Sequence, residues 1–100
     1  MATVSKALFR GAASTSNTTL YTVPSATTAV VTNIVVTNTA TSSATFTLNL
    51  NGVAIQSAST LAANTSAYFD LKQVLAATQT VSGSASATTV NFHISGVEIA

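Results

Sequence analysis

The densest run of β-branched residues in the chain is TAVVTNIVVTN at Thr28–Asn38. β-Branched side chains are stiff at χ1 and pack well on a pleated sheet, so this run predicts a β-strand. In an extended strand one face would carry Val30, Thr32, Ile34 and Val36, and the opposite face would also be half apolar. Because neither face is fully polar, the pattern predicts a central strand of a β-sandwich, covered on both sides.

A β-hairpin is predicted at Asn51-Gly52, because both central residues of a type I′ turn need positive φ and this dipeptide supplies them. A two-residue loop there pairs Leu50 with Val53 and Leu48 with Ile55. The apolar residues that this register would bring to one face are Phe46, Leu48, Leu50, Val53 and Ile55.

The rest of the chain is expected to form short strands joined by turns. Leu71–Ala77 (LKQVLAA) is expected to form a single helical turn, too short to be more than a connector. Past Gly96 the apolar positions change parity, which predicts a glycine bulge at that residue. The other predicted extended segments are Val4–Arg10, Leu20–Pro24, Ala67–Lys72, Thr78–Ser84 and Val90–Ser95.

Seven or eight short strands separated by polar turns, without a long helix, predict an all-β fold. The expected architecture is an antiparallel β-sandwich that is jelly-roll-like. We expect residues 1–17 to form an N-terminal extended arm and loop, and residues 18–100 to form a single β-sandwich domain. Within the first segment Leu8 and Phe9 are adjacent, so it is either a short strand covered on both faces or an arm lying on a partner.

The composition is unusually poor in charge. Of the 100 residues, 47% are hydrophobic and 5% are charged, with a net charge of +1; about 25% charged residues is typical. Such a surface favours a protein that works inside an assembly, because burying charges would cost free energy. The alternative is that hydroxyl groups alone keep the chain in solution. The start of the chain lacks the apolar run of a secretory signal, so export by that route is not expected.

Candidate chemistry is sparse. The chain contains no cysteine and a single histidine, His93, with carboxylates only at Asp70 and Glu98. These residues support neither a metal site nor a catalytic triad, so we predict no enzymatic activity and no cofactor. Three basic residues are too few for nucleic acid, and no apolar stretch is long enough for a membrane. Tyr21 and Tyr68 could stack on a sugar, although two tyrosines in a sandwich more often belong to the core or its rim.

The predicted partner interface is the N-terminal segment, with the candidate residues Val4, Lys6, Leu8, Phe9 and Arg10. Lys6 and Arg10 share one side of an extended segment and are expected to contact an acidic patch on a protein partner; a solvated arm is the alternative. Strand edges could also add to a neighbour's sheet. On this hypothesis a chain without residues 1–10 would fold but bind its partner poorly.

Several segments follow one another in a characteristic order: LYTVP at 20–24, the Val/Ile strand ending in Thr37-Asn38, TLAAN at 60–64, LKQVLAA at 71–77 and VNFHISGVEI at 90–99. In this order they resemble small β-sandwich structural proteins of tailed-bacteriophage virions. The resemblance covers Leu20 to Ile99. It consists of apolar spacing and turns and contains no diagnostic site.

The resemblance implies a location in the virion, after assembly in the host cytoplasm, and leaves two classes of function open. The first is a capsid decoration (cement) protein that binds and stabilises the head shell, with the major capsid protein or another virion protein as partner. Such modules are often homo-oligomers, trimers among them. The second is a tail-fibre or adhesin-type module that recognises a host surface glycan. It predicts a shallow site with exposed aromatics, of which this chain has few, so decoration is favoured.

Overall fold

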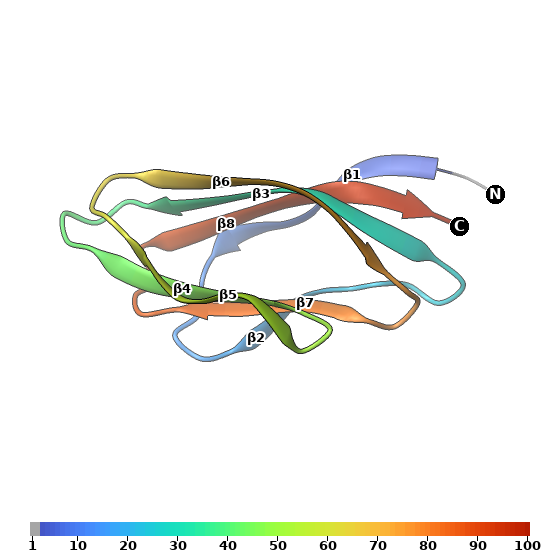
Figure 1. Cartoon of the computed structure of the whole chain (residues 1–100), viewed down its shortest axis with the longest axis horizontal. Helices are drawn as coiled ribbons and strands as arrows, with labels where there is room; N and C mark the ends of the chain where they lie inside the picture. The colour runs from blue at the N-terminus through green and yellow to red at the C-terminus, as the bar shows by residue number, and fades with distance from the viewer. Residues whose placement is uncertain (1–2) are drawn as a thin grey trace.

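The computed structural model describes residues 3–100, which form two four-stranded sheets packed face to face (Figure 1). Every neighbouring pair of strands is antiparallel, which confirms the predicted all-β sandwich. No helix in this part of the chain is long and apolar enough to cross a membrane. The strands are β1 (Thr3–Ala12), β2 (Thr18–Thr22), β3 (Thr28–Asn38), β4 (Ala44–Leu50), β5 (Val53–Leu61), β6 (Ser66–Leu75), β7 (Thr80–Ala85) and β8 (Val90–Ile99).

The strand pairs are nested in sequence. β4 pairs with β5, β3 with β6, β2 with β7 and β1 with β8. Successive pairs fall in opposite sheets, whose orders are β1-β8-β3-β6 and β2-β7-β4-β5. One long hairpin rolled up in this way is a jelly roll.

The core lies between the sheets and takes alternate residues from the central strands. Ile34 of β3 is fully buried, as are Phe92 and Ile94 of β8. The Phe92 ring meets the Phe46 ring of β4 edge-on, with centroids 6.4 Å apart. Burying a side chain of this size contributes about 1.5–3 kcal/mol. The predicted central strand is therefore confirmed, since β3 lies between β8 and β6 and supplies much of this core.

Only one face of β3 is covered, contrary to the prediction. An extra residue, Thr32, bulges out of the pairing of β3 with β8 and reverses the side on which later residues point. Val31 is consequently buried, whereas Val30 and Val35 lie on the outer face of the sheet and are half-buried. No other element of the described chain covers this face (Figure 1).

The hairpin prediction is correct at the turn and wrong beyond it. Asn51-Gly52 has φ values of 50° and 77°, as a type I′ turn requires. The first pair forms as expected, but Leu48 then pairs with Gln56 and not with Ile55. Val53 is exposed and does not contribute to the core. The register of this pair shifts twice, so the ladder between β4 and the edge strand β5 is irregular.

The predicted helical turn at Leu71–Ala77 is wrong, because β6 continues to Leu75. The strand accommodates the irregular apolar spacing with a bulge: two residues separate Asp70 from Gln73 where β3 has one. A seven-residue helix is marginal on its own, so pairing with β3 prevails.

The predicted bulge at Gly96 is not in β8 itself. Two bulges instead lie in the strands on either side of β8, beside Gly96, and their extra residues are Leu8 on β1 and Thr32 on β3. A Cβ at Gly96 would lie 2.3 Å from the Val30 carbonyl oxygen, so the glycine permits a close approach of two backbones. Because β8 runs on without interruption, Val97 lies on the outer face of the sheet beside Val30.

The segment predicted as an arm is an edge strand of the sandwich. β1 pairs with β8 from Thr3–Ile99 to Ala12–Asn91. Residues 13–17 then form the expected loop. The division into an arm at 1–17 and a domain at 18–100 therefore does not describe residues 3–17, and positions 1 and 2 lie outside the described residues.

Candidate functional site

The five predicted interface residues do not form one surface. Leu8 is buried, and Phe9 packs against the core beside it, because the bulge turns both side chains inward. Val4 is half exposed, Lys6 keeps 44% of its side chain exposed, and Arg10 is exposed. Removing residues 1–10 would therefore delete most of an edge strand and two contributors to the core, so such a chain is no longer expected to fold normally.

The bulge at Leu8 also separates the two basic residues. Lys6 lies opposite Gly96, on the side of the sheet that faces the second sheet. Arg10 lies opposite His93, on the outer side. The prediction that Lys6 and Arg10 share one side is wrong, because the extra residue between them reverses the alternation.

Lys6 takes part in a polar cluster that joins the two sheets. Glu98 of β8 accepts hydrogen bonds from the Tyr21 hydroxyl of β2 and from Lys6 Nζ of β1, the latter at 3.4 Å. The Tyr21 hydrogen bond, assisted by Lys6, holds the pKa of Glu98 below its ordinary value, against the opposing effect of desolvation. Burial, followed by the hydrogen bond to Glu98, raises the pKa of Tyr21. Lys6 is thus paired within its own chain.

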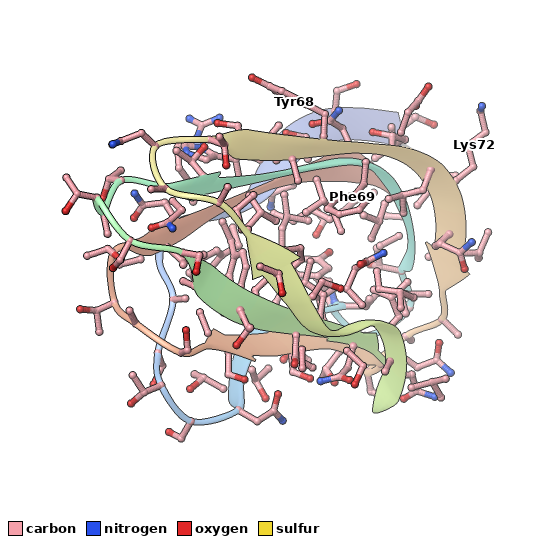
Figure 2. All side chains as sticks on the ribbon, turned by 60° about the vertical axis from the view of Figure 1, so that its left-hand side comes forward. Tyr68, Phe69 and Lys72 are labelled. Atoms are coloured by element: carbon pink, nitrogen blue, oxygen red, sulfur yellow. The ribbon has the colours of Figure 1, made fainter. Side chains whose placement is uncertain are left out.

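The outer face of β1-β8-β3-β6 is here called the mixed face. The register aligns its outward side chains in rows, and one row runs Arg10, His93, Val35, Tyr68 from the β1 edge to the β6 edge. Tyr68 is 74% exposed. Figure 2 shows Tyr68 pointing away from the sandwich, whereas the next residue, Phe69, points into the space between the sheets.

A second row on the mixed face is largely apolar. It runs Ser5, Val97, Val30, Val74, and Val74 at the β6 edge is 66% exposed. Between these two rows lies a third, here called the polar row, in which Ser95, Asn33 and Asp70 follow Ala7 at the β1 edge. The mixed face therefore combines exposed apolar groups with the cation Arg10 at the β1 edge, and with Asp70 and Lys72 at the β6 edge.

The outer face of β2-β7-β4-β5, here called the hydroxyl face, has a different chemistry. None of the residues in these four strands is charged, and all five charged side chains of the protein lie on β1, β6 and β8. Asn49 donates a hydrogen bond to Ser82 at 3.4 Å, and the Thr47 hydroxyl accepts one from the Ala58 amide at 3.0 Å. The outward residues of the two central strands are Thr45, Thr47, Asn49, Ser82 and Ser84.

Residues 3–100 contain no enclosed pocket and no group of three or more His, Cys, Asp or Glu side chains that could hold a metal ion. His93 and Asp70 lie in adjacent rows two strands apart. At about 4.8 Å per strand this is roughly 10 Å, beyond hydrogen-bond reach. In this part of the chain, the surfaces that could bind a partner are therefore the outer faces of the two sheets and their edge strands.

Sequence reasoning does not find the main exposed residues of the mixed face. The sequence indicates Tyr68 only as a residue that could stack on a sugar, and Val74 falls within the helical turn predicted at Leu71–Ala77. Sequence reasoning also misses the apolar row through Val30, because the bulge at Thr32 has no local signal in the sequence. The strict alternation around Phe69 is the signal that could have identified Tyr68 and Asp70, since it places both on the outer side.

Comparison of the chain with models of protein families and with curated proteins finds no match.

Proposed function

We propose that this chain is a structural subunit of a tailed-phage virion, and specifically a capsid decoration protein that binds the head shell and stabilises it. Three things support the proposal. The order of segments resembles such proteins, the jelly roll is a common architecture of viral capsid domains, and the surface chemistry suits permanent burial. The fold alone is an analogy and carries less weight than the surface.

The observation that carries the proposal is the absence of charge from one of the two sheets. The hydroxyl face spans a whole sheet without a charged side chain, in a chain that has only five. Burying a charge against a partner costs several kcal/mol unless it is paired. A face made of threonine, serine and asparagine avoids this cost and can still exchange hydrogen bonds with a shell protein. We assign this face to the contact with the shell.

The edge of β1 provides a second point of attachment. One side of this ten-residue strand pairs with β8, and its other side is an edge of the sheet. A strand of a neighbouring subunit can add to such an edge through backbone hydrogen bonds, with the half-exposed Val4 beside it.

The location is tested by gold labelling of intact particles with an antibody to this chain, viewed by electron microscopy. Label spread over the head is the expected result. Label confined to the tail would favour the second candidate below, and unlabelled particles with a labelled free protein would contradict a virion role.

The contact surface is tested by Ser84→Asp, which places a charge in the middle of the hydroxyl face without removing a hydrogen bond found in the structure. Binding of the purified protein to shells is expected to fall at least about tenfold, since an unpaired buried charge costs more than about 1.4 kcal/mol. The matched control is Ser25→Asp, in the exposed turn between β2 and β3. Equal binding by both variants would refute the assignment of this face.

A second candidate, a tail-fibre module that binds a host glycan, is favoured by one observation. Tyr68 is 74% exposed, and Asp70 lies two residues away on the same side of β6. An exposed aromatic ring beside a carboxylate can stack on a sugar and accept its hydroxyl hydrogen bonds. Glycan binding that is lost in Tyr68→Ala and kept in Ser84→Asp would support this candidate over decoration.

A further inference from the structure

The mixed face is complementary to itself. Its rows run across four strands, so each row starts on β1 and ends on β6. The exposed cation Arg10 stands at the β1 end of one row, and Tyr68 stands at the β6 end of the same row. Asp70 stands at the β6 end of the adjacent row. A surface with a cation at one edge and its partners at the other edge suits a second copy turned by a half-rotation.

We propose that two copies of this chain associate through their mixed faces, around a two-fold axis that runs parallel to the strands between β8 and β3. Rotation about this axis leaves each row at the same position along the strands. It places the β1 edge of one copy over the β6 edge of the other. Arg10 of each copy then lies over the partner's Tyr68 and beside the partner's Asp70. A guanidinium on an aromatic face with a carboxylate nearby is a favourable arrangement.

The same axis matches the chemistry at the centre of the apolar row and of the polar row. In the apolar row, Val97 of each copy meets the partner's Val30. In the polar row, Ser95 meets the partner's Asn33, and both can exchange hydrogen bonds. An axis perpendicular to the strands would instead pair each edge strand with itself, which leaves Arg10 facing β1 of its partner, away from Asp70.

Other charges on this face do not oppose the arrangement. Lys72, which Figure 2 shows pointing outward, lies on the far side of Asp70 from Tyr68. Lys72 lies four positions along the strand from Tyr68, or about 13 Å, which exceeds the screening length at physiological salt. Asp70 is therefore the nearest charge to the incoming Arg10.

The size of the face is sufficient for a dimer of moderate strength. Four strands at about 4.8 Å spacing and about nine residues at roughly 3.3 Å give on the order of 600 Å² in plan for each copy. Two such faces bury roughly 1,200 Å², at the lower end of the range for specific interfaces. Packing two sheets face to face at about 10 Å is the arrangement already present inside each chain.

The first test is the mass of the purified chain by sedimentation velocity at concentrations up to about 100 µM, which covers dimers of moderate strength. The expected species has twice the 10.0 kDa of one chain. A monomer throughout this range, or a trimer, would overturn the proposal.

The second test separates contacts between copies from contacts within one chain. Arg10→Glu and Asp70→Lys each create two like-charge contacts across the axis, so each variant alone should dimerise at least about 100-fold more weakly than the unchanged chain. Mixing the two variants restores both attractive contacts in a heterodimer. Within one chain Arg10 and Asp70 stand on opposite edges of the sheet, roughly 14 Å apart, and cannot pair.

Recovery of the dimer in the mixture, and not in either variant alone, is the expected result. Unweakened dimers of the single variants, or a mixture that stays monomeric, would overturn the proposed axis. Ser84→Asp on the hydroxyl face is the control and should dimerise normally. The dimer is independent of the proposed virion role, because shell binding is read from Ser84→Asp and self-association from the two charge reversals.

Discussion

Of the four glycines in the chain, Gly96 is the one least able to accept a side chain. A Cβ built there lies 2.3 Å from the Val30 carbonyl oxygen, 3.0 Å from Leu8 Cδ1 and 3.2 Å from the Val30 carbonyl carbon. Leu8 can rotate, but the carbonyl belongs to the backbone of the central strand β3. To restore even a 3.0 Å contact, the two backbones must separate by about 0.7 Å, since 3.0 minus 2.3 is 0.7. This shift would fall where β3 already bulges at Thr32.

We therefore predict that Gly96→Ala is strongly destabilising. Overpacking a core by one group typically costs about 1–3 kcal/mol, and the rigid backbone on the other side places this case at the upper end, near 3 kcal/mol. For a domain of this size 1 kcal/mol corresponds to about 4–8 °C in melting temperature, so the expected loss is roughly 12–24 °C. Thermal unfolding followed by far-UV circular dichroism measures it directly.

Two other glycines provide matched controls. A Cβ at Gly11 meets nothing closer than 3.4 Å, so Gly11→Ala should change stability by less than about 1 kcal/mol. Gly52 has open space around it but a φ of 77°, so Gly52→Ala should cost about 1–2 kcal/mol through backbone strain alone. The reasoning would be refuted if Gly96→Ala melted within a few degrees of the unchanged chain, or above Gly52→Ala.

Two further predictions concern polar residues. Asn38 is fully buried and its amide donates to three backbone carbonyls. Asn38→Ala should therefore cost about 2–3 kcal/mol in urea unfolding, whereas Thr41→Ala, in the exposed connection between β3 and β4, should cost little. Equal unfolding midpoints of the two variants would contradict this. Because the folded state lowers the pKa of Glu98, the stability from its ionised form is present above the ordinary value of 4.5 and is lost as pH falls through the lower folded value. The folded state raises the pKa of Tyr21. The stability contributed by its neutral hydroxyl is therefore fully present below about pH 10 and is lost as pH rises beyond that value. Tyr21→Phe should flatten both limbs of a plot of melting temperature against pH, with Tyr68→Phe as the exposed control, and parallel profiles would show that the cluster contributes nothing.

The sequence predicted correctly those elements that are determined by residues close to one another in the chain. The β-branched run at Thr28–Asn38 forms a strand because its side chains pack well on a pleated, partly buried surface. The Asn51-Gly52 turn forms because these two residues accept positive φ. The jelly-roll-like sandwich followed from the number of such strands and the polar turns between them.

The faces of the sheets were harder to predict, because a bulge reverses the parity of every later residue in a strand. The bulges at Leu8 and Thr32 lie on either side of Gly96, where three strands from different parts of the sequence come together. The rows of the mixed face likewise join four strands from across the chain. The segment Val4–Arg10 was predicted correctly as extended. The outward or inward direction of its side chains depends on pairing with β8, which lies far away in sequence.

The nested order of the strands has a consequence for how the molecule reaches its native state. Among the described strands, only the β4–β5 hairpin pairs two strands that follow one another directly in sequence, whereas Thr3 pairs with Ile99, 96 positions away. Folds dominated by such distant pairings usually fold in milliseconds to seconds, slower than helical proteins of equal size. Strand pairing can start at the β4–β5 hairpin and continue with β3–β6 and then β2–β7, so that β1–β8 forms last. During synthesis on the ribosome, β1 would therefore remain unpaired until the ten residues of β8 have emerged. Any chaperone that shields this chain should act on the unpaired β1.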